Sequence, residues 1–583
     1  MSSLEKLKKA VTLSDLAVLL GYKPKAVSYI LYKLSLEEKY TVFTIPKKGG
    51  GERTIKAPTE QLKRLQKRLA DHLGKCYEEI YTKGPHKNPL CHAFRKKFSI
   101  VTNAENHVNR RHVFNADIKD FFPTIHFGRV RGFFIKNVHF TLEPKVATVI
   151  AQIACCGDEL PQGSPCSPVI SNLVAGHLDI RMATLAKKAK CTYSRYADDL
   201  TFSTNRKEFP DLIAVLKEGS DKEWTAGPGL LKELKRADFT INERKTSLQN
   251  STGRQIATGL VVNDKVNVRR EYYKQARSMC YSLFLNGDFY RGSHHVSTIE
   301  QPVASSDVQA EASAEKHAKS GTLNYLEGVL SYIYSVKASH DQRKTCAKRS
   351  YPSAVMKLYR QFLHYKHFFV LQKPLIICEG KTDVIYLKCA LRQLGKSHPS
   401  LIKLNGKEFV YEVSFLNMSK NLKEVFAMSE GTPGLASIME NFHKNMAGFE
   451  GEGKKHPVIL LVDNDSGAKE IKKKIDHKNP AKTFHRYADN LYVILIPNKP
   501  GQEETAIEHL FDAKTLSTTI DGKKFNSSAE LNPKTEYGKI VFAEKVIKAN
   551  QQNIDFSGFD SILQQFEAVI VDYNKQQTQS VTS

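Results

Sequence analysis

Long hydrophobic runs are missing from this sequence. Its 583 residues contain no stretch of about 18 consecutive apolar residues, the length that a membrane-spanning helix needs. The segment from Met1 to Lys9 is polar and basic and carries no apolar signal core. We therefore expect a cytoplasmic protein that has no membrane partner.

Cysteine pairs at metal-binding spacing are also missing. The ten cysteines include no Cys-x-x-Cys pair, which argues against a zinc site and against a disulfide framework. The sequence contains no Gly-x-x-x-x-Gly-Lys-Ser phosphate loop either, so a P-loop ATPase is not expected.

Acidic residues are too few to balance the basic ones. Lys and Arg total 87 against 61 Asp and Glu, which gives a formal net charge of +26. A soluble basic surface is the ordinary explanation. However, an excess of this size in a chain with 24 Tyr and 30 Phe favours a polyanionic partner. Nucleic acid is the first expectation.

The chain is too long for one core and should form about three or four units. Residues 1–40 have helical apolar spacing, and 41–60 alternate as strands around a basic, glycine-rich tip. Strands and helices then alternate up to about residue 270, as in an α+β domain. Residues 293–321 are polar and predict an exposed insertion before a helical block. After Pro374, buried strands at 375–378, 458–462 and 491–496 indicate an α/β unit.

Two adjacent carboxylates, Asp198 and Asp199, lie between the β-favouring runs 192–195 and 200–203. This pattern predicts a hairpin whose tight turn holds both acids. A solvated turn is the ordinary explanation for an isolated Asp-Asp pair. Partly buried neighbouring carboxylates repel each other unless a cation neutralises them, and Mg²⁺ prefers carboxylate oxygens. Asp117, at the end of an apolar strand, is a further candidate ligand.

The motifs and their order resemble those of reverse transcriptases across about residues 1–366. They are the basic tip at 47–53, Asp117 with its aromatic neighbours, Pro161-Gln162-Gly163, Tyr196-Ala197-Asp198-Asp199 and the segment 242–246. The resemblance implies a right-hand polymerase, with fingers and palm over 41–255 and a thumb over 256–366. It also implies that Asp117 and Asp198 bridge two Mg²⁺ ions, with Asp199 in close support.

Further substrate contacts follow from the same resemblance. It implies that Lys48 and Arg53 bind the triphosphate of a dNTP and that Gln162 and Gly163 line the nascent base pair. Phe122 would exclude a ribose 2′-OH, although a core aromatic is the alternative. Lys245 would protonate pyrophosphate, although a solvated lysine is the alternative.

Three details resemble the retron branch, whose enzymes make a branched RNA–DNA hybrid called msDNA. The segment 103–107 fits an Asn-Ala-x-x-His element, Thr258 and Gly259 fit part of a Val-Thr-Gly element, and the N-terminal helical region is short. The resemblance implies RNA contacts at Asn103, His107, Thr258 and Gly259. A core or helix-surface role is the alternative for His107, and Ala257 departs from the retron triplet. No His-Asn-His endonuclease or maturase segment is present, which argues against a group II intron enzyme.

A second group of acids follows the strands of the C-terminal α/β unit. Glu379 comes after the strand 375–378, and Asp463-Asn464-Asp465 follows 458–462. Alternate residues of an extended segment face the same way, so Asp463 and Asp465 can share a cation. The pattern resembles the Rossmann-like Toprim domain over 371–583. It implies that Asp463 and Asp465 bind Mg²⁺ or Mn²⁺, that Glu379 is a metal ligand or a general acid–base, and that Asp383 is a supporting ligand. Glu508 resembles a late acidic motif of Toprim nucleases, with a helix-surface glutamate as the alternative.

The combined prediction is a multidomain α+β and α/β protein, a retron reverse transcriptase fused to a Toprim nuclease. It would use its own non-coding RNA and dNTPs, retain the msDNA, and act in anti-phage defence on host or phage nucleic acid. One alternative is a Toprim half that only binds the RNA–DNA hybrid. Another is an enzyme like those of group II introns. Toprim nucleases often self-associate, which leaves a homo-oligomer open.

Overall fold

The computed structural model describes residues 1–46, 51–83, 89–291, 319–343, 345–406, 408–426, 428, 432–440, 442–475, 482–498, 501–528 and 530–582. The chain divides into two compact units, Met1–Arg269 and Arg270–Ser583. None of the described helices has the length and apolar character needed to cross a membrane. The predicted polar insertion at 293–321 lies almost wholly outside the described residues, as does Lys48.

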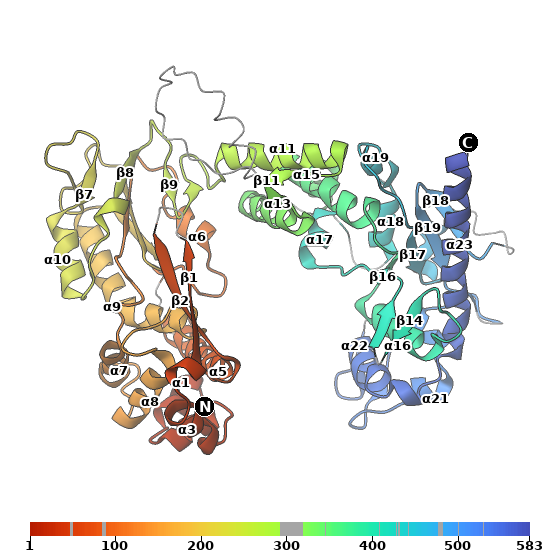
Figure 1. The fold of residues 1–583 in the computed structure, drawn as a ribbon, viewed down its shortest axis with the longest axis horizontal. Helices are drawn as coiled ribbons and strands as arrows, with labels where there is room; N and C mark the ends of the chain where they lie inside the picture. Colours follow the sequence, from red (N-terminus) through yellow and green to blue (C-terminus); the bar gives the residue numbers. More distant parts are fainter. Residues whose placement is uncertain are drawn as a thin grey trace. The chain divides into compact units, whose positions relative to one another are not determined.

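The first unit joins helices to an antiparallel sheet (Figure 1). Its helices are α1 (Ser3–Lys8), α2 (Leu13–Leu19), α3 (Pro24–Tyr32), α4 (Leu36–Lys39), α5 (Glu60–Glu78), η1 (Glu79–Lys83), α6 (Ile100–Glu105), α7 (Phe127–Lys136), α8 (Pro144–Ala154), α9 (Ser167–Lys188), α10 (Pro228–Arg236) and η2 (Glu243–Lys245). Its strands are β1 (Tyr40–Pro46), β2 (Glu52–Pro58), β3 (His112–Asp117), β4 (Thr192–Tyr196), β5 (Asp199–Thr204), β6 (Ala214–Leu216), β7 (Trp224–Ala226), β8 (Ser247–Asn250), β9 (Ile256–Ala257) and β10 (Leu260–Val261).

The central sheet of this unit has the order β4-β5-β3-β8. Its strands are antiparallel, and Phe114 of β3 lies opposite Phe202 of β5 with both side chains fully buried. Helix α9 packs against β4 and α5. Because α9 is buried on several faces, it lacks the narrow apolar stripe of a surface helix. Helix α9 therefore covers β4, the strand that leads into the β4–β5 turn.

The hairpin of β1 and β2 confirms the strands predicted at 41–60. The two strands are antiparallel, with Ile45 opposite Arg53 and Tyr40 opposite Pro58. The backbone N–H of Lys56 donates to the carbonyl of Gln162 at 2.9 Å. This bond attaches the hairpin to the loop that leads into α9.

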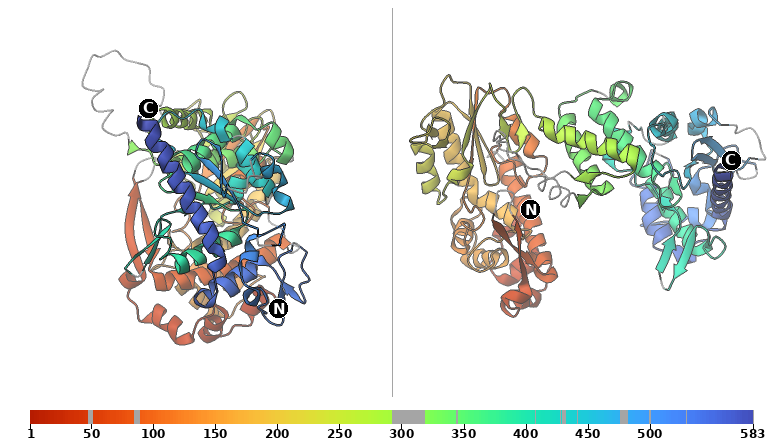
Figure 2. Two further views of the ribbon diagram at one scale, coloured as in Figure 1. Left: turned by 90° about the vertical axis from the view of Figure 1, so that its right-hand side faces the viewer. Right: turned by 45° about the horizontal axis from the view of Figure 1, so that its top comes forward.

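The second unit has a mostly parallel sheet with helices around it (Figures 1 and 2). Its helices are α11 (Arg270–Asn286), α13 (Leu323–Ala338), α14 (Thr345–Ser350), α15 (Ala354–His364), η4 (Tyr365–Phe369), α16 (Lys381–Leu394), α17 (Lys420–Val425), α18 (Thr432–Glu440), α19 (Phe442–Met446), η5 (Ser466–Ala468), α20 (Lys469–Lys472), η6 (Ile507–Leu510), α21 (Ala513–Leu516), α22 (Lys539–Val541), η7 (Phe542–Lys548), η8 (Gln551–Asn553), η9 (Ser557–Phe559) and α23 (Asp560–Thr582). Its strands are β11 (Tyr290–Arg291), β12 (Lys319–Ser320), β13 (Leu375–Ile377), β14 (Ile402–Asn405), β15 (Glu408–Tyr411), β16 (Ser414–Phe415), β17 (Val458–Val462), β18 (His485–Ala488), β19 (Leu491–Leu495), β20 (Lys524–Phe525) and β21 (Glu536–Tyr537).

The sheet of the second unit has the order β16-β13-β17-β19-β18. Strands β13, β17 and β19 are parallel and lie where the sequence predicted buried strands. All residues of β17 are buried, as expected for a parallel strand covered on both faces. The long helix α23, dark blue in Figure 2, packs beside β19 through the ring contact of Tyr573 with Tyr492.

Helix α11 of the predicted thumb packs against η4 and the segment after α19 through one aromatic cluster. Phe284 of α11 contacts Phe449 and Tyr365, with ring centroids 5.1 and 5.6 Å apart. Phe369 contacts both Tyr365 and Phe449. The carbonyl of Phe284 also accepts a bond from the N–H of Glu450 at 3.0 Å. Residues 270–366 therefore pack with the C-terminal part, and the predicted four-part division of the chain stays a prediction.

Candidate active sites

Strand register brings the first group of acids together at one end of the sheet. Asp117, the last residue of β3, lies opposite Asp199, the first residue of β5. The predicted hairpin is confirmed, because β4 and β5 pair from Thr192 to Asp199 and leave Ala197 and Asp198 as its tip. The N–H of Ile118 donates to the carbonyl of Asp198 at 2.9 Å. All three carboxylates thus belong to one site.

The three carboxylates of this group repel one another, and the pKa values of Asp198 and Asp199 are raised. Burial first, and then Asp198 and Asp117, raise the pKa of Asp199 to about 7. Because the Asp199 residue is exposed, we attribute the upward direction mainly to its acidic neighbours. Burial and Asp117 raise the pKa of Asp198 as well, while Lys245 and Arg53 act in the opposite direction. A dication would remove the cost of three carboxylates that lie so close.

Asp117 is bonded on both carboxylate oxygens. Lys245 Nζ donates to Oδ2 at 2.8 Å, and Asn242 Nδ2 donates to Oδ1 at 3.1 Å. Within the described ranges no set of three or more His, Cys, Asp or Glu side chains converges to hold a metal ion. The donor chemistry nevertheless fits Mg²⁺, which takes carboxylate oxygens and several waters. Asp117 would exchange Lys245 for the ion.

The loop after α8 places a glycine against the β1–β2 hairpin. Gly163 has φ of +117°, and a Cβ there would lie 3.0 Å from the carbonyl oxygen of Lys56. Only glycine combines this backbone conformation with such a close approach. Gly163 and Arg53 are both exposed, and Gln162 is half-buried. A nucleotide could therefore reach all three residues, which the predicted dNTP contacts require.

Phe122 is half-buried beside two other aromatic residues. Its ring makes an edge contact with buried Phe121 at 5.4 Å and a tilted contact with Phe94 at 6.4 Å. Phe94 itself is 49% exposed. Phe122 thus packs against the core of the first unit through Phe121 and is only partly exposed.

Direct RNA contact by the side chains of Asn103 and His107 is the prediction that the structure contradicts. Both side chains are fully buried. The His107 ring lies between two hydroxyls, with Nδ1 and Nε2 each 2.7 Å from the Oγ atoms of Ser203 and Ser194. His107 therefore connects β4 to β5 through the two serine hydroxyls. Among the described residues, neither side-chain amide atom of Asn103 has a hydrogen-bond partner.

Acid should destabilise the hairpin through His107. Burial lowers its pKa to about 3, whereas the unfolded value is about 6.5. Between these values the unfolded chain binds one more proton, so stability falls as the pH falls below about 6.5. We expect a loss of about 2 kcal/mol between pH 7.5 and 5. Other buried histidines also titrate over this pH range, so the wild type is compared with His107→Gln, in which they are unchanged. The measured quantity is the stability of β4 and β5 in the full chain, obtained from urea-dependent hydrogen exchange at each pH. Equal acid-dependent losses in the two proteins would exclude His107 as the cause.

Thr258 and Gly259 form the turn between β9 and β10. Their φ values are +46° and +82°, as in the two-residue turns that suit hairpins. Thr258 Oγ1 donates to the carbonyl of Ile100, the first residue of α6, at 3.2 Å. Gly259 is exposed, and a Cβ there would meet no atom within 4 Å. The turn remains open to RNA, which leaves the predicted contact a proposal.

The second group of acids lies at the carboxyl ends of neighbouring parallel strands. Because β13 pairs with β17, Glu379 and Asp463 come side by side, and the N–H of Asp463 donates to Glu379 Oε1 at 3.2 Å. Thr432 Oγ1 lies 2.9 Å from both Glu379 oxygens. Asp383 accepts from the N–H of Gly380 at 2.8 Å. Asp465 accepts from the N–H of Gly467 at 2.9 Å.

Glu508 joins this second group, as its resemblance to a late acidic motif suggested. Segment 505–508 reaches Asp463 because Asn464 and Thr505 exchange two backbone hydrogen bonds. The N–H of Ile507 donates to Asp463 Oδ1 at 3.0 Å. Glu508 is 1% exposed, so the helix-surface alternative is wrong. Its Oε1 has no partner among the described residues.

Lys539 is the site residue that sequence reasoning missed. Its Nζ donates to Glu508 Oε2 at 3.0 Å, and its side chain is 37% exposed. Burial opposes its charge, but Glu508, Asp463 and Asp383 together raise its pKa. No motif marks a single lysine after Tyr537-Gly538, and only the packing of α22 brings it to the acids.

The second group has the electrostatics of a cation site. Burial first, and then Glu379, Asp383 and Glu508, raise the pKa of Asp463 to about 8. Burial raises the pKa of Glu379 and that of Glu508. One lysine cannot offset this many carboxylates. A hard divalent cation such as Mg²⁺ or Mn²⁺ fits the donor set.

Comparison with known proteins identifies the class of enzyme to which the first unit is similar. A reverse transcriptase (RNA-dependent DNA polymerase) family model matches residues 45–268, which contain the first group of acids. Retron Ec86 reverse transcriptase of Escherichia coli is 31% identical over 253 residues, which cover 42% of this chain and 70% of the relative. Retron Ec73 reverse transcriptase of the same organism is 34% identical over 230 residues, 37% of this chain and 67% of the relative. The chain belongs to the retron reverse transcriptase family.

Two further similarities cover more of this chain. Retron Mx65 reverse transcriptase of Myxococcus xanthus is 30% identical over 328 residues, which cover 54% of this chain and 64% of the relative. Apo telomerase from Candida tropicalis aligns with 70% of this chain and 67% of its own, at 11% identity. Its TM-score of 0.29 is too low to support an argument about the fold.

Proposed function

We propose that this chain is the RNA-directed DNA polymerase of a retron and makes branched msDNA from its own non-coding RNA. The observation that carries the proposal is the meeting of Asp117, Asp198 and Asp199 through the β3–β5 register. Family membership supports the same activity. The net charge of +26 supports an RNA partner.

Each residue of the first site has a role in this reaction. Asp117 and Asp198 would hold Mg²⁺, with Asp199 beside them. When bound, the ions lower the pKa of the attacking hydroxyl and stabilise the charge of the leaving pyrophosphate. Arg53 would bind the triphosphate through its bidentate fork. Lys245, released from Asp117, would carry a proton on Nζ to the pyrophosphate.

The test of this proposal is synthesis from the cognate RNA. The purified chain, the RNA encoded beside its gene, dNTPs and Mg²⁺ should give labelled DNA covalently attached to RNA. By analogy with the family, priming would start from a 2′-OH of an internal guanosine. Synthesis only from a generic template with a 3′-OH primer would instead support the intron-like alternative.

Phe122 should determine the choice between dNTPs and rNTPs. Its ring packs against Phe121, which would hold it against a ribose 2′-OH. Phe122→Ala removes the obstacle, and we expect selectivity for dNTPs over rNTPs to fall by about 10- to 100-fold, the size of a pocket contact worth 1–3 kcal/mol. Single-nucleotide incorporation with dGTP and GTP measures the ratio. Phe133→Ala, at another half-buried phenylalanine, is the matched control. Unchanged selectivity in Phe122→Ala would identify Phe122 as a core aromatic.

We further propose that the second group of acids is a metal-dependent, Toprim-like nuclease site. The specific observation in its favour is that Glu379, Asp463 and Glu508 come together at the carboxyl ends of β13 and β17, with Asp383 and Lys539 nearby. Glu379 and Asp463 would hold the cation, and Asp465 and Asp383 would support it. Lys539 would bind the negative charge of a phosphate. Restraint of this nuclease by msDNA would make the chain an anti-phage effector.

A non-catalytic second unit is the competing proposal. In that case the unit only binds the RNA–DNA hybrid, and another protein cleaves. Mn²⁺-dependent cleavage of labelled DNA, messenger RNA or tRNA by the purified chain would favour the nuclease. Binding without cleavage in all three would favour the scaffold.

A further inference from the structure

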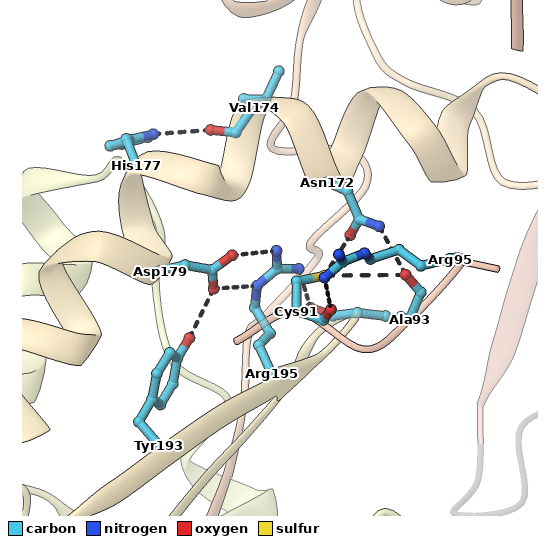
Figure 3. A network of polar contacts seen from close by, with 10 residues as sticks. Cys91, Ala93, Arg95, Asn172, Val174, His177, Asp179, Tyr193 and Arg195 are labelled. Atoms are coloured by element: carbon cyan, nitrogen blue, oxygen red, sulfur yellow. Dashed lines mark hydrogen bonds and ion pairs between the residues drawn. The ribbon is translucent and has the colours of Figure 1, made fainter. Parts of the chain in front are cut away.

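A fully buried ion pair connects β4 of the β4–β5 hairpin to α9 (Figure 3). Arg195 of β4 donates from Nε to Asp179 Oδ1 at 2.7 Å and from Nη2 to Oδ2 at 2.8 Å. Their side chains are 0% and 1% exposed. The hydroxyl of Tyr193 donates to the same Oδ1 at 3.0 Å. Both oxygens of the Asp179 carboxylate are therefore used in holding the guanidinium in one orientation.

The remaining edge of the guanidinium reaches the turn itself. Arg195 Nη1 donates to the carbonyl oxygen of Ala197 at 2.9 Å. Ala197 has φ of +57°, a left-handed conformation that is unfavourable for a residue with a Cβ. The bond from Arg195 thus holds a strained residue immediately before Asp198.

Asp198 is fixed through both of its peptide groups. The preceding carbonyl, that of Ala197, accepts from Arg195. The following carbonyl, its own, accepts from the N–H of Ile118, next to Asp117. With both peptide planes held, the Cα–Cβ direction of Asp198 is set relative to Asp117. Arg195 supplies one of the two restraints.

Arg195 is in turn anchored by its surroundings. Its N–H donates to the carbonyl of Leu90 at 2.8 Å, and its carbonyl accepts from the N–H of His92 at 2.9 Å. Cys91 Sγ donates to Asn172 Oδ1 at 3.1 Å, and Asn172 Nδ2 donates to the carbonyl of Ala93 at 2.8 Å. Figure 3 shows the bonds of Asn172 that join α9 to Cys91 and Ala93 near the ion pair. The guanidinium therefore has little freedom to move away from Ala197.

We propose that Arg195, oriented by Asp179, is a positioning residue that sets the Asp198 carboxylate for Mg²⁺ binding in DNA synthesis. A buried ion pair is seldom needed for stability alone, because apolar residues of similar volume replace such pairs at little cost. The third donor, which apolar residues cannot supply, is what connects this pair to the active site. This inference rests on the proposed polymerase function.

Two variants separate positioning from simple stabilisation. The triple variant Asp179→Leu/Tyr193→Phe/Arg195→Met replaces the polar cluster with apolar side chains and leaves no buried charge unpaired. Arg195→Lys keeps the cation opposite Asp179 but lacks the planar fork that reaches Ala197 at the same time. Lys217→Met, which breaks an exposed pair with Glu223, is the matched control. Thermal unfolding of the full chain shows which variants keep the wild-type transition.

The expected result is a loss of metal affinity and turnover in a folded protein. We expect kcat to fall by about 10- to 100-fold in both Arg195 variants, the usual effect of removing a partner that orients a metal ligand. KM for dNTP should stay within about twofold, because the dNTP contacts lie elsewhere. Titration with Mn²⁺ followed by electron paramagnetic resonance should show weaker binding at the site that Asp198→Asn removes. Lys217→Met should match the wild type.

Several outcomes would overturn the inference. A folded triple variant with wild-type kcat and wild-type Mn²⁺ binding would show that Arg195 only stabilises the sheet. If the triple variant loses its thermal transition, kcat and Mn²⁺ binding of Arg195→Lys decide whether Arg195 positions Asp198. If the wild type makes no DNA, the proposed polymerase function fails, while Mn²⁺ binding by the variants still decides whether Arg195 positions Asp198.

Discussion

Asp198→Asn should abolish DNA synthesis without unfolding the chain. The substitution removes the charge that would hold Mg²⁺ but keeps the shape of the side chain and both backbone bonds of the turn. It also relieves the cost of burying this charge and its repulsion with Asp117, which together raise the pKa of Asp198 in the native protein. A metal ion contributes several kcal/mol to stabilising the transition state, so the rate should fall by roughly a thousandfold or more. Steady-state incorporation of labelled dNTP on the cognate RNA measures it.

Asp221→Asn is the matched control for this prediction. Asp221 is exposed in the segment between β6 and β7, outside the site, and should retain full activity. Thermal unfolding should give Asp198→Asn a transition equal to or above that of the wild type, because a repulsive charge is lost. An Asp198→Asn enzyme that synthesises DNA within tenfold of the wild-type rate would remove this carboxylate from the reaction.

Asp463→Asn should abolish cleavage by the second unit and leave DNA synthesis unchanged. Asp463 lies between Glu379 and the N–H of Ile507, at the centre of the second group. Burial and its acidic neighbours raise its pKa to about 8, so its charged form is unfavourable unless a cation lies beside it. Loss of its charge should weaken metal binding and lower the cleavage rate by roughly a thousandfold. Mn²⁺-dependent release of labelled fragments provides the measurement.

The control for Asp463→Asn is Asp521→Asn. Asp521 is exposed in a turn with φ of +51°, a conformation that Asn also accepts, so the substitution tests charge alone. It should leave both activities unchanged. If cleavage persists in Asp463→Asn, the cleavage does not depend on this site. The proposal that the second unit only binds the RNA–DNA hybrid would then be favoured.

Strand ends were the most predictable part of both sites. Asp117 and the Asp198–Asp199 pair flank apolar, β-favouring runs, and the pairing of those runs brings the acids together. Glu379 and Asp463 follow parallel strands whose neighbouring order could be expected from an α/β pattern. In each case local sequence determines both the strand and the position of the acid at its end.

Residues whose roles depend on tertiary packing were not predictable. Arg195 lies in a run that predicts a strand, but nothing in that run shows that Asp179 of the preceding helix pairs with it and that both side chains are buried. His107 has the sequence context of an RNA contact, yet two serine hydroxyls from β4 and β5 enclose its ring. Lys539 reaches the second acid group only because α22 packs beside Glu508. A single sequence does not reveal such partners.

The most direct test of the account is production of msDNA by three forms of the chain. The wild type, Asp198→Asn and Asp463→Asn would each be expressed with the native region that encodes the RNA, and nucleic acid would be run on a denaturing gel after RNase treatment. The account predicts a short RNase-resistant DNA in the wild type and in Asp463→Asn, and none in Asp198→Asn. Absence of the DNA from the wild type, or its presence in Asp198→Asn, would contradict the account.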